Sequence, residues 1–121
     1  MVLGKDAEKV VLRYRISRKE RIAESEDFKR VMRFGKRVSS RNLRVCVKEN
    51  AAGVNRFGVV VRKEVGGAAY RNRVKRFCRE FFRLHKHEIS GSVDMIFIAK
   101  KTCSWERYRQ AEDELRGLLI S

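Results

Sequence analysis

The sequence lacks the features on which disulfide-rich, zinc-binding and membrane-spanning proteins depend. Its three cysteines, Cys46, Cys78 and Cys103, lie far apart and form no C-x-x-C pair. An odd, dispersed set of this kind indicates reduced thiols in a protein core. No apolar run reaches the roughly 18 residues that a membrane span needs, and the N-terminus has no apolar signal-peptide region. We therefore expect a cytoplasmic protein with no membrane partner. Proline is absent as well, which excludes nothing here.

Motifs of nucleotide-binding proteins and serine hydrolases are also missing. The sequence contains no G-x-x-x-x-G-K-[ST], G-x-G-x-x-G or G-x-S-x-G. Gly66 and Gly67 precede a predicted helix, but adjacent glycines also form ordinary turns and are a weak sign of phosphate binding. His85 and His87 are two residues apart and diverge on a helix. We expect them to be a solvated pair rather than metal ligands.

The acidic residues do not follow the pattern of a metal-dependent nuclease. A two-metal site needs carboxylates from separate elements that hold two ions about 4 Å apart. Here the acids cluster on two predicted helix surfaces, at residues 24–27 and 112–114, and Asp94 is the only acid within a predicted strand. We therefore expect no self-contained active site in the protein. Whether the protein binds a metal itself is left unknown.

Acidic residues are scarce beside the basic ones. The 121 residues include 30 Lys and Arg but 15 Asp and Glu, which gives a net charge of +15. Hydrophobic residues make up 43% of the chain, which argues against a disordered tail and suits one domain with one core. The excess of positive charge favours a nucleic acid or another anionic surface as partner.

The positive charge is concentrated in residues 68–87, AAYRNRVKRFCREFFRLHKH. The apolar positions that recur at helical spacing are Val74, Phe77, Cys78, Phe81 and Leu84 or His85. The basic positions of another face are Arg71, Lys75, Arg79 and Lys86, with Arg73, Arg76 and Arg83 along a neighbouring edge. Glu80 is the only acid, and like charges at i, i+4 destabilise a helix by roughly 0.2–0.5 kcal/mol per pair. We therefore expect a polyphosphate backbone to neutralise this face.

Two more helices are expected, one on each side of this segment. Residues 25–34 have an apolar stripe, with Ser25 as the cap and Gly35 as the end of the helix. Residues 104–119 form the last helix, capped by Ser104, with a core stripe at Trp105, Tyr108, Ala111, Leu115 and Leu118. Residues 1–20 have weak periodicity and are expected to be a basic, mobile or loosely docked extension of a domain at 21–121.

The strands are predicted at residues 43–48, 56–62 and 93–99, and a further strand can lie near residues 37–41. In 43–48 the residues alternate, so that Leu43, Val45 and Val47 face the core and Arg44, Cys46 and Lys48 are presented on the other face. The short spacing between 43–48 and 56–62 favours an antiparallel hairpin. The order is α-β-β-(β)-α-β-α in a single α+β domain.

One segment carries a family resemblance. Residues 63–76, KEVGGAAYRNRVKR, followed by Arg79 and Glu80, closely resemble the signature of the bacterial ribonuclease P protein subunit. That signature is R-N-R-x-K-R on a helix, after a K-x-x-G-x-A-like loop. The likeness extends to residues 25–28, to Gly35 and to the predicted hairpin, and it covers about residues 21–119.

The resemblance implies a fold and a function. The fold would be a sheet with helices on one face, similar to a ribosomal-protein domain, with a β-α-β crossover of the uncommon left hand. The protein would bind a large catalytic RNA, which cuts precursor tRNA with Mg²⁺ and leaves a mature 5′ phosphate end. Its own part would be to contact the 5′ leader, to improve substrate binding and metal affinity, and to screen backbone repulsion. The partners implied are the catalytic RNA and precursor tRNA, with no obligate protein partner.

The resemblance also implies two sets of site residues. The positions that would bind the catalytic RNA are Arg71, Asn72, Arg73, Lys75, Arg76 and Arg79. The positions of a cleft that would hold the leader are Phe28, Met32, Arg44, Cys46 and Lys48. For the second set, the alternation of residues 43–48 selects the same strand face independently. A cleft with stacking surface and positive charge suits an unpaired strand bound with little sequence preference.

Four residues depart from the family pattern. Met32 and Cys46 stand where aromatic residues are common, Arg44 stands where an apolar residue often sits, and Glu64 replaces a usual second lysine. We expect a cleft that depends more on charge and less on stacking than is typical.

Three other functions are compatible with parts of the sequence. A ribosomal protein or RNA chaperone of similar fold would share the charge without a preference for precursor tRNA. A protein-only nuclease would need the convergent carboxylates that the sequence lacks. A helix-turn-helix DNA reader is disfavoured because the basic helix follows a strand and a loop.

Overall fold

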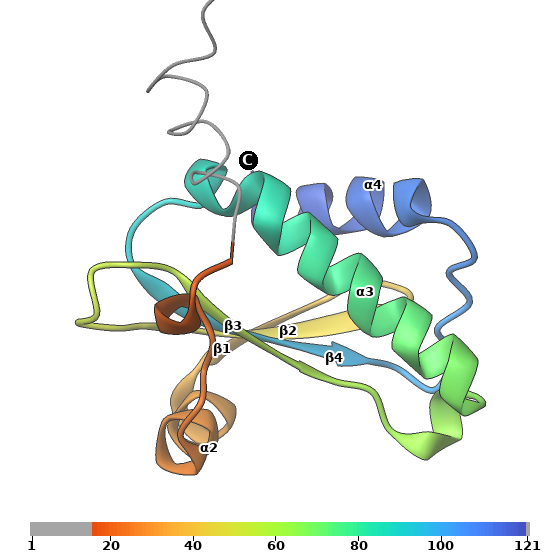
Figure 1. Cartoon of the computed structure of the whole chain (residues 1–121), viewed down its shortest axis with the longest axis horizontal. Helices are drawn as coiled ribbons and strands as arrows, with labels where there is room; N and C mark the ends of the chain where they lie inside the picture. Colours follow the sequence, from red (N-terminus) through yellow and green to blue (C-terminus); the bar gives the residue numbers. More distant parts are fainter. Residues whose placement is uncertain (1–15, 121) are drawn as a thin grey trace, which may run out of the picture.

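The computed structural model describes residues 16–120, which form four strands, three α-helices and three short 3-10 helices (Figure 1). In chain order the elements are η1 Arg18–Glu20, α2 Ser25–Phe34, β1 Lys36–Ser39, β2 Leu43–Glu49, β3 Arg56–Val60, η2 Lys63–Val65, α3 Ala68–His85, η3 Lys86–Glu88, β4 Val93–Ala99 and α4 Tyr108–Leu119. The predicted α+β class and element order are confirmed, and the additional strand expected near residues 37–41 is β1.

The four strands form one mixed sheet in the order β1-β2-β4-β3. β1 and β2 are antiparallel, β2 and β4 are antiparallel, and β3 and β4 are parallel. The predicted hairpin of residues 43–48 and 56–62 is therefore wrong, because β4 lies between β2 and β3. The sequence of β4, VDMIFIA, explains its position: a strand with buried residues on both faces belongs in the centre of a sheet.

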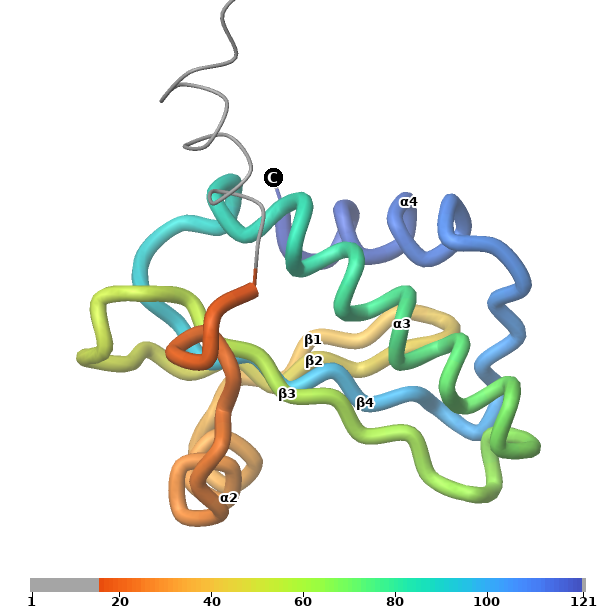
Figure 2. The backbone as a smooth tube through the Cα atoms, viewed as in Figure 1, coloured from red at the N-terminus to blue at the C-terminus, as the bar shows by residue number. Residues whose placement is uncertain are grey.

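The segment between β3 and β4 is a β-α-β crossover through α3, in which the two strands run in parallel. The left hand of this crossover stays a prediction from the resemblance. In Figure 1 and Figure 2, α3 runs diagonally across the sheet, and α4 follows β4 on the same side.

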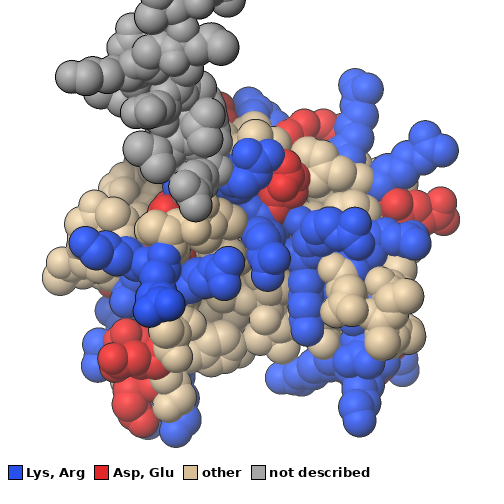
Figure 3. All heavy atoms as spheres, viewed as in Figure 1, with Lys and Arg blue, Asp and Glu red and all other residues tan. Residues whose placement is uncertain are grey.

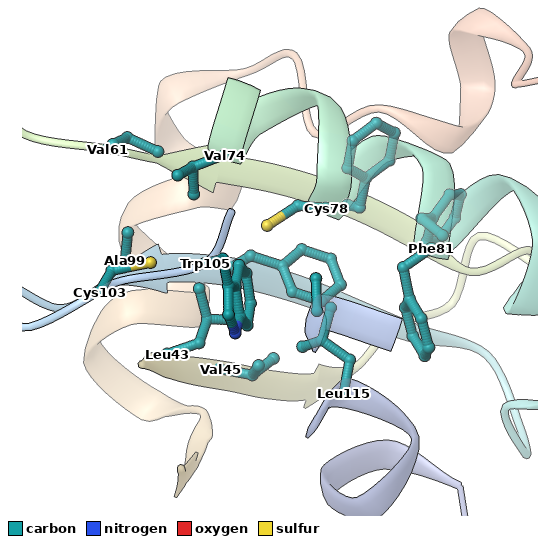
Figure 4. Close-up of a cluster of buried hydrophobic side chains, with 14 of the residues drawn as sticks. Leu43, Val45, Val61, Val74, Cys78, Phe81, Ala99, Cys103, Trp105 and Leu115 are labelled. Carbon is teal, nitrogen blue, oxygen red and sulfur yellow. The ribbon is translucent and has the colours of Figure 1, made fainter. Parts of the chain in front are cut away.

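The main core lies between the sheet and the helices α3 and α4. In Figure 4, Val74, Cys78 and Phe81 of α3 and Leu115 of α4 lie in one cluster with Trp105 and with Leu43 and Val45 of β2. Phe57 of β3 and Phe82 of α3 stack with ring centroids 4.5 Å apart. The predicted helical spacing in residues 74–81 and the inward phase of Leu43 and Val45 are thus confirmed, although Phe82 is also buried and Phe77 is only half-buried.

A second, smaller core lies on the opposite face of the sheet, under α2. Its buried residues are Val31, Cys46 and Ile96, and partly buried Phe28 and Met32 pack against them. The expectation that all helices cover one face is therefore wrong. Cys46 and Ile96 are apolar and point away from the main core, so this face also needs a cover, and the stripe of α2 provides it.

The last helix begins later than predicted. α4 starts at Tyr108 rather than near Ser104, and Arg107 is its N-cap residue. The segment before it is irregular because it brings Trp105 into the core, where its exposed fraction is 1%. The side-chain oxygen of Gln110 accepts bonds from the N–H groups of Glu106 and Arg107, 2.7 and 3.0 Å away, and so closes the helix start.

Candidate RNA-binding surfaces

The first candidate surface is the outer face of α3. The last two residues of the loop before α3 are Gly66, which has a φ of 159°, and Gly67, which is the N-cap of the helix. The Nε of Arg71 donates to the carbonyl oxygen of Gly66 at 3.1 Å, and the hydroxyl of Tyr70 donates to the carbonyl oxygen of Cys103 at 3.2 Å. Burial and the neighbouring Cys103 raise the pKa of Tyr70 to about 12, so this phenol stays a neutral donor. These bonds fix the first turn of α3 to the loop that precedes it and to the loop that follows β4.

The structure places the predicted RNA-binding residues of α3 on its solvent side. Arg71 is half-buried, and the exposed residues are Asn72, Arg73, Lys75, Arg76 and Arg79. Within residues 16–120, the ion pairs of α3 belong to Arg83 and His85 nearer its end, so these exposed cations have no carboxylate partner there. Figure 3 shows Lys and Arg side chains crowded over this side of the molecule. The physical result is a row of uncompensated positive charge that suits a phosphate backbone.

Two residues at the end of the helix do not belong to this surface. Lys86 was expected on the basic face, but it lies in η3, is 6% exposed, and its Nζ is 2.5 Å from Glu20. Burial opposes ionisation of Glu20, yet the bonds from Lys86 and Ser17 outweigh it and lower the pKa of this carboxyl. The 3-10 turn tightens the helix end and brings Lys86 inward, which the α-helical spacing could not predict.

His85 also differs from the prediction of a solvated histidine. Its side chain is 12% exposed and lies between the carboxylates of Glu88 and Glu112, with Nε2 2.9 Å from Glu112. Its ring also contacts Phe81, 4.7 Å away between centroids. His85 therefore connects α3, η3 and α4. His87, by contrast, is exposed.

The second candidate surface is a groove beside α2, at the end of the sheet where β3 and β4 end. Its volume is about 390 Å³. Its lining consists of Met32, Arg37, Arg44, Cys46, Arg62, Glu64, Ile98, Ala99, Lys100 and Lys101. Met32, Cys46 and Ile98 belong to the small core, so the groove combines an apolar floor with cationic walls.

Three of the five predicted leader residues, Met32, Arg44 and Cys46, meet in this groove. Cys46 is fully buried, so it forms the floor rather than a presented surface. Lys48 lines a different groove of about 420 Å³, together with Arg30 and Asp94. Phe28 packs over β3, where its ring would be 3.4 Å from a Cβ at Gly58. The predicted cleft is therefore divided, because α2 covers the middle of this sheet face.

Sequence reasoning missed seven of the ten residues that line the groove. The missed cations are Arg37, Arg62, Lys100 and Lys101, which lie in β1 or within two residues of the ends of β3 and β4. The pair Lys100-Lys101, directly after the predicted strand 93–99, could have indicated a cationic site at the end of that strand. Arg37 and Arg62 could be found only from the strand order, which brings the ends of β2, β3 and β4 together.

The two carboxylates Asp94 and Glu114 are used for structure. Asp94 is 4% exposed and accepts two bonds from Arg56, at 2.7 and 2.6 Å, and one from Asn50 at 2.7 Å. Burial raises the pKa of Glu114, but bonds from Ser40, Asn42 and Trp105 outweigh it and lower the pKa overall. Among residues 16–120, no three His, Cys, Asp or Glu side chains are grouped to hold a metal ion.

The cysteines are consistent with a reduced core. Cys46, Cys78 and Cys103 are all free and buried. Burial raises the pKa of the Cys78 thiol far above its ordinary value.

Within the described chain, no helix is both long and apolar enough to cross a bilayer.

The sequence matches the family model described as Ribonuclease P over residues 16–121. The chain belongs to the ribonuclease P protein family. The ribonuclease P protein component of Syntrophus aciditrophicus is 36% identical over 104 residues, which cover 86% of this chain and 87% of that protein. The corresponding protein of Clostridium acetobutylicum is 36% identical over 103 residues, with coverages of 84% and 87%.

Solved ribonuclease P proteins have the same fold. The Staphylococcus aureus ribonuclease P protein at 2.0 Å superposes with a TM-score of 0.74 and 32% identity, covering 82% of this chain and 91% of that one. The Thermotoga maritima ribonuclease P protein gives a TM-score of 0.75 and 30% identity, covering 83% and 94%. The family suggested by the R-N-R-x-K-R helix is thus confirmed, and a role in tRNA 5′ processing agrees with it.

Proposed function

We propose that this protein binds the catalytic RNA of ribonuclease P through the exposed face of α3 and the 5′ leader of precursor tRNA through the cationic groove under the sheet. The observation that carries the proposal is that the groove, although it lies on the opposite face of the sheet, is joined to the start of α3 by the short segment η2. Arg62 and Glu64 of the groove lie at η2, directly before the N-terminal loop of α3. One protein can therefore contact both RNAs and screen the repulsion between their phosphates.

The groove suits an unpaired nucleotide. Its volume of about 390 Å³ lies within the range of roughly 300–1,000 Å³ for small-ligand sites. The apolar floor at Met32 and Ile98 offers contact to a base, while Arg44, Arg62 and the lysines that follow β4 can bind phosphate oxygens. The floor has no aromatic residue, which favours binding by charge and contact area over stacking.

Catalysis is assigned to the RNA. The buried carboxylate Asp94 is paired with Arg56, and Glu114 is bound by Asn42, so neither is available as a metal ligand. In this proposal Mg²⁺ acts in the RNA subunit, the product has a 5′ phosphate, and the protein contributes positive charge and position. A cytoplasmic location and the absence of an obligate protein partner stay predictions from the sequence.

The test is cleavage of a precursor tRNA at low Mg²⁺ by a bacterial ribonuclease P RNA, with and without this protein. We expect correct 5′ maturation to require both components under these conditions. Controls are the protein alone and a substrate whose leader is cut to one nucleotide, for which the gain in affinity should disappear. No stimulation, together with tight binding to unrelated structured RNA, would favour a ribosomal or chaperone role instead.

A further inference from the structure

A third cationic surface extends beyond both sites. Residues 28–48 contain eight Lys and Arg and no Asp or Glu. This segment forms most of α2, then β1 and β2. The eight cations are Lys29, Arg30, Arg33, Lys36, Arg37, Arg41, Arg44 and Lys48, and none of them is buried. Only Arg37 and Arg44 line the groove assigned to the leader.

An exposed aromatic ring stands on this surface. Phe34, the last residue of α2, is 67% exposed, and the only other large exposed hydrophobic residue in 16–120 is Val54 at 36%. The guanidinium carbon of Arg33 lies 5.4 Å from the centroid of the Phe34 ring, which is a cation–π distance. An exposed ring held beside a cation suits a ligand that is both flat and anionic.

The position of Phe34 is fixed by the packing of the residue that follows it. The N–H of Gly35 donates to the carbonyl oxygen of Val31 at 2.9 Å. A Cβ at Gly35 would be 2.6 Å from that oxygen and 3.0 Å from the carbonyl oxygen of Val47. Close contact of the backbone with β2 therefore holds the end of α2, and Phe34 projects from a fixed point.

Phe34 is separate from the leader groove. At 100° per residue, it lies about 200° around the helix from Met32, which lines that groove, and about 40° from Arg30. Arg30 lines the second groove, of about 420 Å³, with Lys48. The aromatic ring thus belongs to the other side of α2.

We propose that Phe34 is a stacking platform for one unpaired base of RNA, with Arg33 and Lys36 contacting the adjoining phosphates. Stacking on an exposed ring accepts any base, and the neighbouring cations supply affinity for the backbone. A second copy of this chain is a poor occupant, because it would bring the same cations face to face. The base can come from the leader or from the catalytic RNA, and the proposal rests on the RNA-binding function above.

The test combines a reporter with loss-of-function variants. Phe34→Trp adds an exposed indole to a protein whose single tryptophan, Trp105, is buried, and a stacked base should quench its fluorescence. Titrants are the catalytic RNA alone and, on the assembled holoenzyme, precursor tRNA with a long or a one-nucleotide leader. Phe34→Ala and Phe34→Leu should each weaken binding of the quenching RNA by about 5- to 100-fold. Val54→Ala, the other exposed apolar residue, is the matched control and should leave binding unchanged.

The outcomes separate the alternatives. Quenching only with the long leader identifies the leader as the source of the base, and quenching by the catalytic RNA identifies that RNA. Full binding by Phe34→Leu with loss in Phe34→Ala would overturn stacking in favour of simple apolar contact. Normal RNA binding by both variants, without quenching in Phe34→Trp, would overturn the proposal. The proposal would also be overturned if the wild-type protein formed dimers in the absence of RNA and Phe34→Ala did not. If the wild-type protein does not stimulate cleavage at all, it is the proposed function that fails, not this assignment.

Discussion

Arg73 and Arg76 are exposed residues of α3 without a carboxylate partner in the described chain, so their charge is available to RNA. Each phosphate contact releases counterions, which makes affinity fall with salt. We expect Arg73→Ala or Arg76→Ala to weaken binding of the catalytic RNA and to reduce the slope of log K against log[salt] by about one unit. Arg109→Ala, on α4, is the control. An unaltered slope would mean that these side chains are solvated in the complex.

Phe28 has two roles to separate, because its ring packs against the small core and was also expected to stack on the leader. We expect Phe28→Ala to cost about 1–3 kcal/mol in leader affinity if a base stacks there. Phe28→Leu keeps most of the apolar packing but lacks a flat face. Binding of long-leader substrate by both variants, measured beside their urea stability, distinguishes the roles. Normal leader affinity in Phe28→Leu would assign Phe28 to packing alone.

Glu114 shows how one carboxylate can join distant parts of the fold. It accepts bonds from the N–H of Asn42 at 3.0 Å, from Trp105 Nε1 at 3.2 Å and from the Ser40 hydroxyl. We expect Glu114→Gln to lower the free energy of unfolding at pH 7 by about 1–3 kcal/mol, because buried donors lose a charged acceptor. Trp105 fluorescence during urea denaturation measures this, and Asp113→Asn, at the next position, is the control.

The pH dependence of that effect has a definite sign. The pKa of Glu114 is lowered in the folded state from its ordinary value of 4.5, so its contribution is complete above pH 4.5 and is lost as the pH falls through the folded value. The gap between wild type and Glu114→Gln should therefore shrink below pH 4.5. An equal gap at pH 7 and at low pH would contradict a role for the charge.

At the scale of elements, the position of α2 depends on a glycine. Because a Cβ at Gly35 would meet two backbone oxygens at 3.0 Å or less, Gly35→Ala should push α2 away from β2, lower stability and weaken leader binding. Gly117 lies within α4 with nothing within 4 Å of its added Cβ. Gly117→Ala should therefore stabilise the protein by about 0.5–1 kcal/mol. Thermal unfolding of both variants tests the pair, and equal effects of the same sign would refute the close contact.

The strand order also acts at this scale, because it creates the groove. β4 is the last strand in sequence, yet it lies between β2 and β3. The residues after β3 and after β4, Arg62 and Lys100, therefore lie near Arg44 at the start of β2. In the predicted hairpin, β3 would have taken the place of β4 beside β2. The groove proposed to bind the leader is thus a consequence of the crossover through α3.

For the whole molecule, the net charge of +15 favours RNA binding but lowers the stability of the free protein. Self-repulsion destabilises the compact state, and salt screens it over a Debye length of about 10 Å at 0.1 M. We expect the Tm of the free protein to rise by a few degrees between about 0.01 and 0.3 M KCl, while the affinity for RNA falls over the same range. Scanning calorimetry and binding in the same buffers test both signs. A Tm that falls with added KCl would show that ion pairs such as Lys86–Glu20 outweigh the repulsion.

The sequence by itself determined the features that depend on near neighbours in the chain. Helical spacing identified the apolar and basic sides of α3, alternation in β2 separated Val45 from Arg44, and the R-N-R-x-K-R run indicated the family. These predictions were correct because side-chain direction follows from a period of 3.6 or 2 residues, whatever the rest of the fold. The same local rules placed α2 within its observed bounds, although its N-cap is Glu24 rather than Ser25.

Only the tertiary structure decided what depends on residues far apart in the sequence. It placed β4 in the centre of the sheet, α2 on the face opposite α3, Lys86 in a buried ion pair and Trp105 before its helix. Strand pairing and the burial of a charge depend on which distant segment covers a given face. Local periodicity does not identify that segment. For the same reason the five predicted cleft residues are divided between two grooves and the small core. The cations Arg73, Lys75, Arg76 and Arg79 of α3 need no distant partner and are exposed, as the helical spacing predicted.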